Sequence, residues 1–151
     1  MSIRLATTSD EAIIAALRFE WTTEQRGDVP ESDDFEDRFH RWFVREADQR
    51  RTWLAAAGES TVGMLNLLVF TRMPKPGVTH VRTQWGYVAN AYVMKAHRDS
   101  GWGTRLMDAC IAHATEQNFA RLVVSPSEQS ISLYERAGFA PATSLMVRSF
   151  N

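Results

Sequence analysis

Cysteine is almost missing from this chain of 151 residues, which contains only Cys110. One cysteine cannot form an intrachain disulfide framework or a zinc site built on several thiolates, so we expect neither, and no metal centre. Cys110 falls within an apolar helical pattern, which favours a buried and unreactive thiol over a nucleophile.

An excess of charge of either sign is missing too. Lysine and arginine number 17 and aspartate and glutamate 18, for a net charge of −1. There is thus no basic field to indicate nucleic acid and no polybasic segment to indicate a membrane surface. No apolar run reaches membrane-spanning length, and Asp10 and Glu11 lie where a signal peptide needs apolar residues. We expect one cytoplasmic domain over residues 1–151.

Apolar spacing predicts the order strand, two helices, three strands, helix, strand, helix, strand. Three helix starts carry recognisable signals: Thr8 with Glu11 as a capping box, Pro30 with Ser32, and Ser125 with Pro126 and Glu128. The expected strands are 3–6, 52–57, 61–70, a segment within 81–93, 121–124 and 145–150, the last closing the sheet.

A glycine turn interrupts the chain after the strand that ends near Val93. Its pattern is R-x-x-G-x-G, formed by Arg98, Gly101 and Gly103, and a helical pattern follows at once. Free backbone N–H groups and the helix dipole favour an anion there, and the two glycines let a phosphate or pyrophosphate approach closely. The P-loop string G-x-x-x-x-G-K-[ST] does not occur, and Leu106 stands where a dinucleotide fingerprint needs its third glycine.

A second signature, Leu-Tyr-Glu-Arg-Ala-Gly-Phe, spans residues 133–139, one helix and one strand after the glycine turn. The two signatures, in this order, resemble those of the GNAT superfamily of N-acetyltransferases, convincingly over about residues 87–139. The resemblance implies an α/β (α+β) fold whose mixed central sheet is splayed at the coenzyme site and flanked by helices. It also implies acetyl-CoA as the acyl donor.

The resemblance assigns roles to individual residues. Tyr134 matches the general acid that protonates the departing thiolate, and Ser127 stands where the family often has a coenzyme-contacting asparagine. Asp99 replaces a usual glycine, and Trp102 is bulkier than usual, which favours packing in the core. The backbone of Ala91, Tyr92 and Val93 should hold the pantetheine arm, and Arg98, Asp99, Ser100, Gly101, Trp102, Gly103 and Thr104 should hold the pyrophosphate.

The general base and the acceptor are less clearly encoded. Asn90 lies on the relevant strand but can at most orient a water, and His80, in the preceding loop, titrates in the right range. Glu20 and Glu24, one helical turn apart, could bind or deprotonate an amine. Acidic residues outnumber basic ones between positions 20 and 48, which favours a cationic amine acceptor. The sequence leaves a homodimer as one alternative for the oligomeric state.

Three functions remain open from the sequence. The leading one is an acetyl-CoA-dependent N-acetyltransferase that acts on a primary amine of a small molecule or peptide, by direct attack in a ternary complex. The second is a non-catalytic or regulatory acyl-CoA-binding domain of the same fold. The third is another phosphate-ligand binder, for example of a nucleotide.

Overall fold

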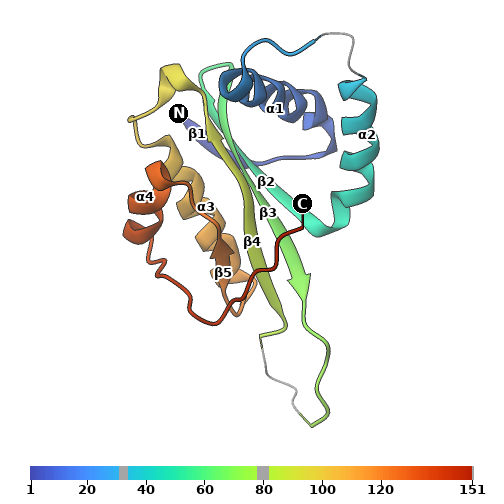
Figure 1. Cartoon of the computed structure of the whole chain (residues 1–151), viewed down its shortest axis with the longest axis vertical. Coiled ribbons are helices and arrows are strands. Elements are labelled where there is room, and N and C mark those ends of the chain that lie inside the picture. The colour runs from blue at the N-terminus through green and yellow to red at the C-terminus, as the bar shows by residue number, and fades with distance from the viewer. Residues whose placement is uncertain (31–33, 78–81, 151) are drawn as a thin grey trace.

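The computed structural model describes residues 1–30, 34–77 and 82–150. In this part of the chain, strands form a mixed sheet in the order β1-β2-β3-β4-β5 (Figure 1). The first four strands are antiparallel neighbours, whereas β5 runs parallel to β4. The strand bounds are β1 Ser2–Leu5, β2 Arg50–Ala57, β3 Ser60–Thr71, β4 Gln84–Val93 and β5 Leu122–Val124.

Helices cover both faces of the sheet. Figure 1 places α1 and α2 on one side and α3 and α4 on the other. Their bounds are α1 Glu11–Arg26, α2 Phe35–Glu46, α3 Trp102–Glu116 and α4 Ile131–Arg136. This arrangement confirms the expected mixed sheet flanked by helices.

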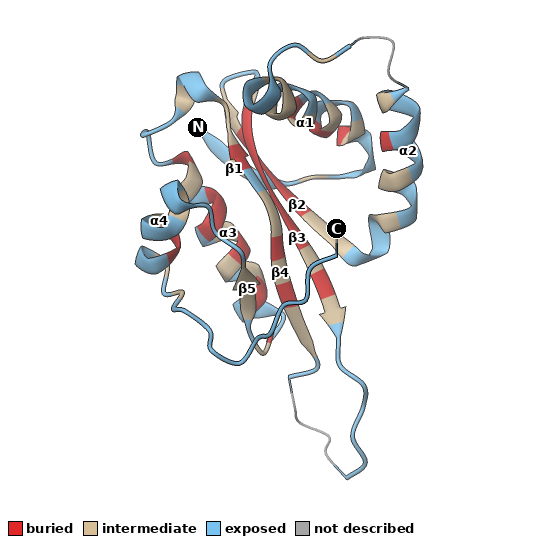
Figure 2. Ribbon diagram, in the orientation of Figure 1, coloured by how far each residue is buried: buried red, intermediate tan, exposed pale blue. Residues whose placement is uncertain are grey.

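The core lies on both faces of the central strands, as the red segments of β2, β3 and β4 in Figure 2 show. Neighbouring residues of a strand point to opposite faces. On β3, Leu65 and Leu67 pack toward α3, while Met64 packs toward α1 and α2. The doubly apolar sequence of this strand is therefore explained by a layer of helices on each side.

A β-bulge in β4 changes which way its second half points. Asn66 of β3 pairs with Asn90, but Leu67 pairs with Val88, so β4 carries Ala89 as an extra residue. Val88 accordingly packs on the α3 side, whereas Tyr92, four residues later, packs on the α1 side. Without the bulge, the two side chains would share a face, so the bulge turns Tyr92 toward α1.

The expected closing strand at 145–150 is wrong. These residues form no strand, and Met146 and Val147 are 99% and 87% exposed. An apolar pattern makes a strand only where it can pair and be buried, because β propensity depends strongly on context. Here β5, with three residues, is the last strand of the sheet.

Three expected helix starts differ from the structure. The capping contact of α1 lies one residue earlier than expected: the Thr7 N–H donates to the Asp10 carboxylate over 2.7 Å. The second helix begins at Phe35, beyond Pro30. Ser125 starts no helix; a 3₁₀ turn at Glu128–Ser130 precedes α4. Ser32, His80 and Val81 lie outside the described residues.

Candidate functional site

The sheet opens between β4 and β5. Their parallel pairing covers three residue pairs and ends at Val88 and Val124, while β4 continues to Val93. Past that point lies a cleft of about 870 Å³, walled by β4, the glycine turn, the start of α3 and the residues around α4. The splayed sheet expected from the sequence is therefore present.

The free edge of β4 presents backbone groups to this cleft. The Met94 N–H donates to the Val62 carbonyl of β3 over 2.8 Å. Because alternate residues face opposite edges of a strand, Tyr92 also turns its backbone toward β3, while Ala91 and Val93 turn theirs toward the cleft. The Val93 carbonyl accepts a hydrogen bond from Arg98 Nε over 2.9 Å, which agrees with this alternation. Of the three residues expected to hold the pantetheine arm, Ala91 and Val93 therefore turn their backbone groups to the cleft, whereas Tyr92 does not.

The glycine turn forms a cradle of N–H groups at the mouth of the cleft. Asp99 (φ 61°) and Gly101 (φ 85°) both have left-handed backbones, and Gly101 is the N-cap residue of α3. Alternating backbone hands aim successive N–H groups at one point, and the first turn of a helix leaves its N–H groups without intrahelical partners. A Cβ on Gly101 would meet nothing within 4 Å, so this glycine is required by its φ and faces open space.

Two residues of the turn contribute differently. The Trp102 side chain is buried in the core against α3 and the sheet, so only its backbone can serve the cleft. A Cβ on Gly103 would lie 3.4 Å from Leu133 Cδ2, at the wall formed by α4.

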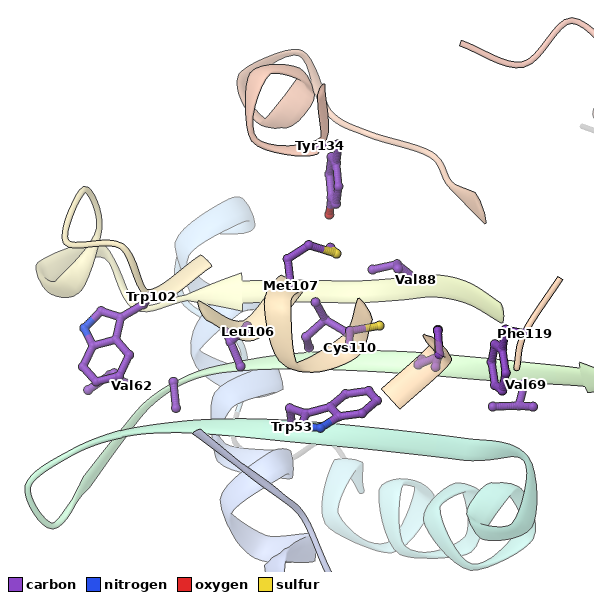
Figure 3. Packing of buried hydrophobic residues seen from close by; sticks show 14 residues of the cluster. Trp53, Val62, Val69, Val88, Trp102, Leu106, Met107, Cys110, Phe119 and Tyr134 are labelled. Atoms are coloured by element: carbon purple, nitrogen blue, oxygen red, sulfur yellow. The ribbon is translucent and has the colours of Figure 1, made fainter. Parts of the chain in front are cut away.

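Tyr134 enters the cleft from α4. Its ring is 7% exposed and packs edge-on against Phe139, with centroids 5.5 Å apart. Figure 3 shows its hydroxyl pointing away from α4, toward Met107 and β4. Burial, followed by the nearby Cys110 and Tyr87, raises the pKa of Tyr134. The phenol therefore stays protonated at neutral pH and can donate a proton.

Cys110 of α3 is fully buried, as expected. Burial raises the pKa of its thiol to about 12. The thiol is therefore a packing group and not a nucleophile.

Glu24 does not stand free for a substrate in this structure. Its carboxylate contacts both terminal nitrogens of Arg98, at 2.6 and 2.9 Å, and accepts a hydrogen bond from the Tyr92 hydroxyl at 3.0 Å. The hydrogen bond from Arg98 is the largest cause of a lowered pKa at Glu24. A carboxylate whose pKa is lowered is a poor proton acceptor, so Glu24 is not suited to be the base.

The surrounding acidic segment is also partly neutralised. Asp34 pairs with Arg38 at 2.8 Å, and Glu46 pairs with Arg50 at 3.2 Å. The acidic excess counted along the sequence therefore overstates the negative field of the folded α1 and α2 region.

Most of the residues that the sequence assigned to the site line one cleft. They are Ala91, Tyr92, Val93, Arg98, Asp99, Gly101, Trp102, Gly103, Thr104, Ser127 and Tyr134. The described residues Ser100, Asn90, Glu20 and Glu24 are not part of this lining. Asn90 lies on β4 opposite Asn66 of β3.

Sequence reasoning missed several residues of the cleft lining, among them Trp21 and Arg136. Trp21 of α1 stacks on the Tyr92 ring, with centroids 5.4 Å apart and planes 13° apart. Its helical spacing had identified it only as a core residue. Arg136, the last residue of α4, donates to the Ser132 hydroxyl at 3.1 Å and adds a positive charge to the cleft. It is the arginine of the second signature, so that motif could have identified it from the sequence.

The acetyltransferase (GNAT) family matches residues 12–139 of the chain. The chain belongs to this family. The glycine turn, the strands β4 and β5 between which the sheet opens, and Tyr134 all fall within the matched residues. No curated protein sequence matches the chain.

Solved structures share the GNAT fold over almost the whole chain. A predicted acetyltransferase with acetyl-CoA from Clostridium acetobutylicum is 18% identical, with a TM-score of 0.76, and the match covers 98% of this chain and 95% of that one. A GCN5-related N-acetyltransferase from Ralstonia eutropha is 24% identical, with a TM-score of 0.74 and coverage of 98% and 97%. A ribosomal-protein-alanine N-acetyltransferase from Brucella melitensis is 20% identical, with a TM-score of 0.73 and coverage of 99% and 100%.

None of the helices in the described residues is long and apolar enough to cross a bilayer. Residues 1–30, 34–77 and 82–150 also contain no cluster of three or more His, Cys, Asp or Glu side chains that could hold a metal ion.

Proposed function

We propose that this GNAT chain is an acetyl-CoA-dependent N-acetyltransferase that moves an acetyl group to a primary amine by direct attack in a ternary complex. The observation that carries the proposal is the cleft itself. It combines an open strand edge, an N–H cradle for a diphosphate and a protonated tyrosine, all in one continuous space.

The residues present fit coenzyme A. A pantetheine arm has amide groups that can pair with the free N–H and C=O groups of Ala91 and Val93, extending the sheet where β5 ends. A diphosphate suits the N–H groups from Asp99 to Thr104 and the positive end of α3. The left-handed φ of Gly101, with open space beyond it, leaves room for such an anion.

The thioester supplies an activated acyl group, and the chain supplies positioning and a proton. The amine nitrogen forms a bond to the acetyl carbon while the carbon–sulfur bond breaks. The N–H of Val93 faces the cleft and suits the negative charge that develops on the acetyl oxygen. Tyr134, with its raised pKa, donates its proton to the thiolate, whose own pKa is about 8 to 9.

Among the described residues, the acyl end of the cleft offers no His, Asp or Glu side chain that could accept the proton of the amine. His97 and Asp99 line the cleft, but both belong to the turn that would receive the diphosphate. A free alkyl amine has a pKa near about 10, so only a small fraction is neutral at pH 7. We therefore propose that the amine reacts from its neutral fraction and loses its proton to water.

The decisive experiment is an amine panel incubated with acetyl-CoA, with free thiol followed by a colorimetric reagent and products by mass spectrometry. We expect thiol release that requires both the protein and an amine, together with an N-acetylated product. Binding of acetyl-CoA without transfer to any amine would instead support a non-catalytic acyl-CoA-binding domain. Binding of ATP or NAD in preference to acetyl-CoA would support a different phosphate ligand.

A further inference from the structure

Arg98 opens the R-x-x-G-x-G pattern of the glycine turn, yet all three nitrogens of its side chain already contact other residues of the chain. Its Nη1 and Nη2 atoms contact the two carboxylate oxygens of Glu24, at 2.6 and 2.9 Å. Its Nε donates to the Val93 carbonyl at 2.9 Å. All three nitrogens are thus bound to β4 and α1, while Arg98 lines the cleft beside the N–H cradle that follows it in the chain.

Glu24 joins this arginine to the wall of the cleft. Besides Arg98, it accepts the Tyr92 hydroxyl at 3.0 Å. The Tyr92 ring stacks on Trp21, with centroids 5.4 Å apart, and its centroid lies 5.7 Å from the Arg98 guanidinium carbon. One carboxylate therefore connects the last turns of α1, the end of β4 and the residue that begins the diphosphate turn.

We propose that Glu24 and Arg98 form a latch that the diphosphate of coenzyme A opens, because the diphosphate and Glu24 compete for the same guanidinium group. This inference rests on the proposed coenzyme site. When the latch opens, Arg98 turns to the diphosphate. Glu24 then becomes an unpaired carboxylate beside the Tyr92 hydroxyl, a site for the ammonium group of an acceptor before it is deprotonated.

The strength of the pair suits a latch. The side chains of Arg98 and Glu24 are 41% and 28% exposed, and ion pairs open to water contribute little net free energy. A diphosphate offers more acceptor oxygens and more charge than one carboxylate, and guanidinium groups bind phosphate oxygens in the same bidentate manner. Since Arg98 directly precedes the N–H cradle, its side chain can reach an anion held there by rotation of its own bonds.

The latch also couples the binding of the coenzyme to the binding of a cationic acceptor. Before the coenzyme binds, the charge of Glu24 is neutralised by Arg98, so a cationic acceptor gains little from it. After the coenzyme binds, the same carboxylate is available. Coenzyme should therefore raise the affinity for a cationic acceptor, and the acceptor should raise the affinity for coenzyme by the same factor.

Titration calorimetry with coenzyme A tests the latch without any need for turnover. Glu24→Gln should bind coenzyme A about three- to fivefold more tightly than the unmodified protein, the fold-change expected for removing a solvent-accessible ion pair that competes. Arg98→Gln should bind more weakly. In the Arg98→Gln background, Glu24→Gln should have almost no further effect, because the two residues act through one interaction.

Glu20→Gln is the matched control. It removes the same charge one turn earlier on α1, and in the described part of the chain Glu20 is not an ion-pair partner of Arg98. Its coenzyme affinity should stay within about 1.5-fold, since exposed charges are screened by salt. Thermal unfolding of each variant checks that the fold is kept.

Each outcome of these titrations either supports the latch or overturns it. Weaker or unchanged coenzyme binding by Glu24→Gln would overturn the latch while leaving the proposed function intact. A gain of equal size in the Arg98→Gln background would also overturn it, because Glu24 would then repel the coenzyme directly. If the unmodified protein bound no coenzyme A, the proposed function would fall and the latch with it.

Discussion

Replacing Tyr134 with phenylalanine separates the proposed chemistry from packing. The substitution removes one hydroxyl and keeps the ring that packs edge-on against Phe139 at 5.5 Å. Because that hydroxyl points into the cleft, its loss should change the free energy of unfolding by less than about 1 kcal/mol. Loss of a general acid should lower kcat by roughly ten- to a thousandfold, which corresponds to about 1.4 to 4 kcal/mol of transition-state stabilisation.

The assay is steady-state thiol release with saturating acetyl-CoA, paired with calorimetric titration of acetyl-CoA. We expect the coenzyme affinity of Tyr134→Phe to be almost unchanged, so the loss should appear in kcat. Thr115→Val is the control, because it removes one hydroxyl of α3, bonded to the Ile111 carbonyl, outside the cleft lining. A kcat of Tyr134→Phe within about twofold of the unmodified value would refute the acid role and leave Tyr134 as a packing residue.

Three further predictions follow from the same site. Gly101→Val forces a β-branched residue to the left-handed φ of 85°, which costs at least about 1 to 2 kcal/mol. The variant should stay folded but show no coenzyme binding in calorimetry. An unchanged affinity would contradict the N–H cradle. The value of kcat/KM for the amine should rise about tenfold per pH unit toward the amine pKa of about 10. Tyr134 should cause no fall in this range, because its pKa is raised. A plateau of kcat/KM near pH 7 would instead indicate that a side chain of the protein acts as the base. Cationic amines should have lower KM values than neutral ones, with a difference that shrinks between about 0.05 and 0.5 M salt. With saturating acetyl-CoA, Glu24→Gln should raise the KM of a cationic amine more than it lowers kcat; a KM indifferent to both salt and this substitution would exclude an acidic acceptor site.

The glycine turn and its place beside the cleft were predictable from the sequence because they depend on local backbone geometry. Glycine at position 101 is readable as a need for a left-handed φ, and the strand before it and the helix after it follow from apolar spacing. The order of the two signatures then brings Tyr134 to the same cleft, and the structure does place it there.

The acceptor side was less predictable because it depends on contacts between distant residues. Glu24 and Arg98 are 74 positions apart, and nothing in their local sequence marks them as partners. The bulge at Ala89, which turns Tyr92 toward α1, likewise arises from the register between β3 and β4. The count of acidic residues between positions 20 and 48 therefore indicated a free negative site where the fold has formed an ion pair between Glu24 and Arg98.

The expected strand at 145–150 failed for a related reason. Alternating apolar residues describe what a segment can do, but pairing requires an available edge in the right place. Its side chains, Met146 above all, stay exposed beyond β5.

A crystal structure of the protein with bound coenzyme A tests the central claim most directly. The account predicts the pantetheine arm between β4 and β5, hydrogen-bonded to the backbone of Ala91 and Val93, with the diphosphate over residues 99–104 and the sulfur near the Tyr134 hydroxyl. Coenzyme A bound elsewhere on the protein, or a sulfur held far from Tyr134 with the β4 edge empty, would contradict it.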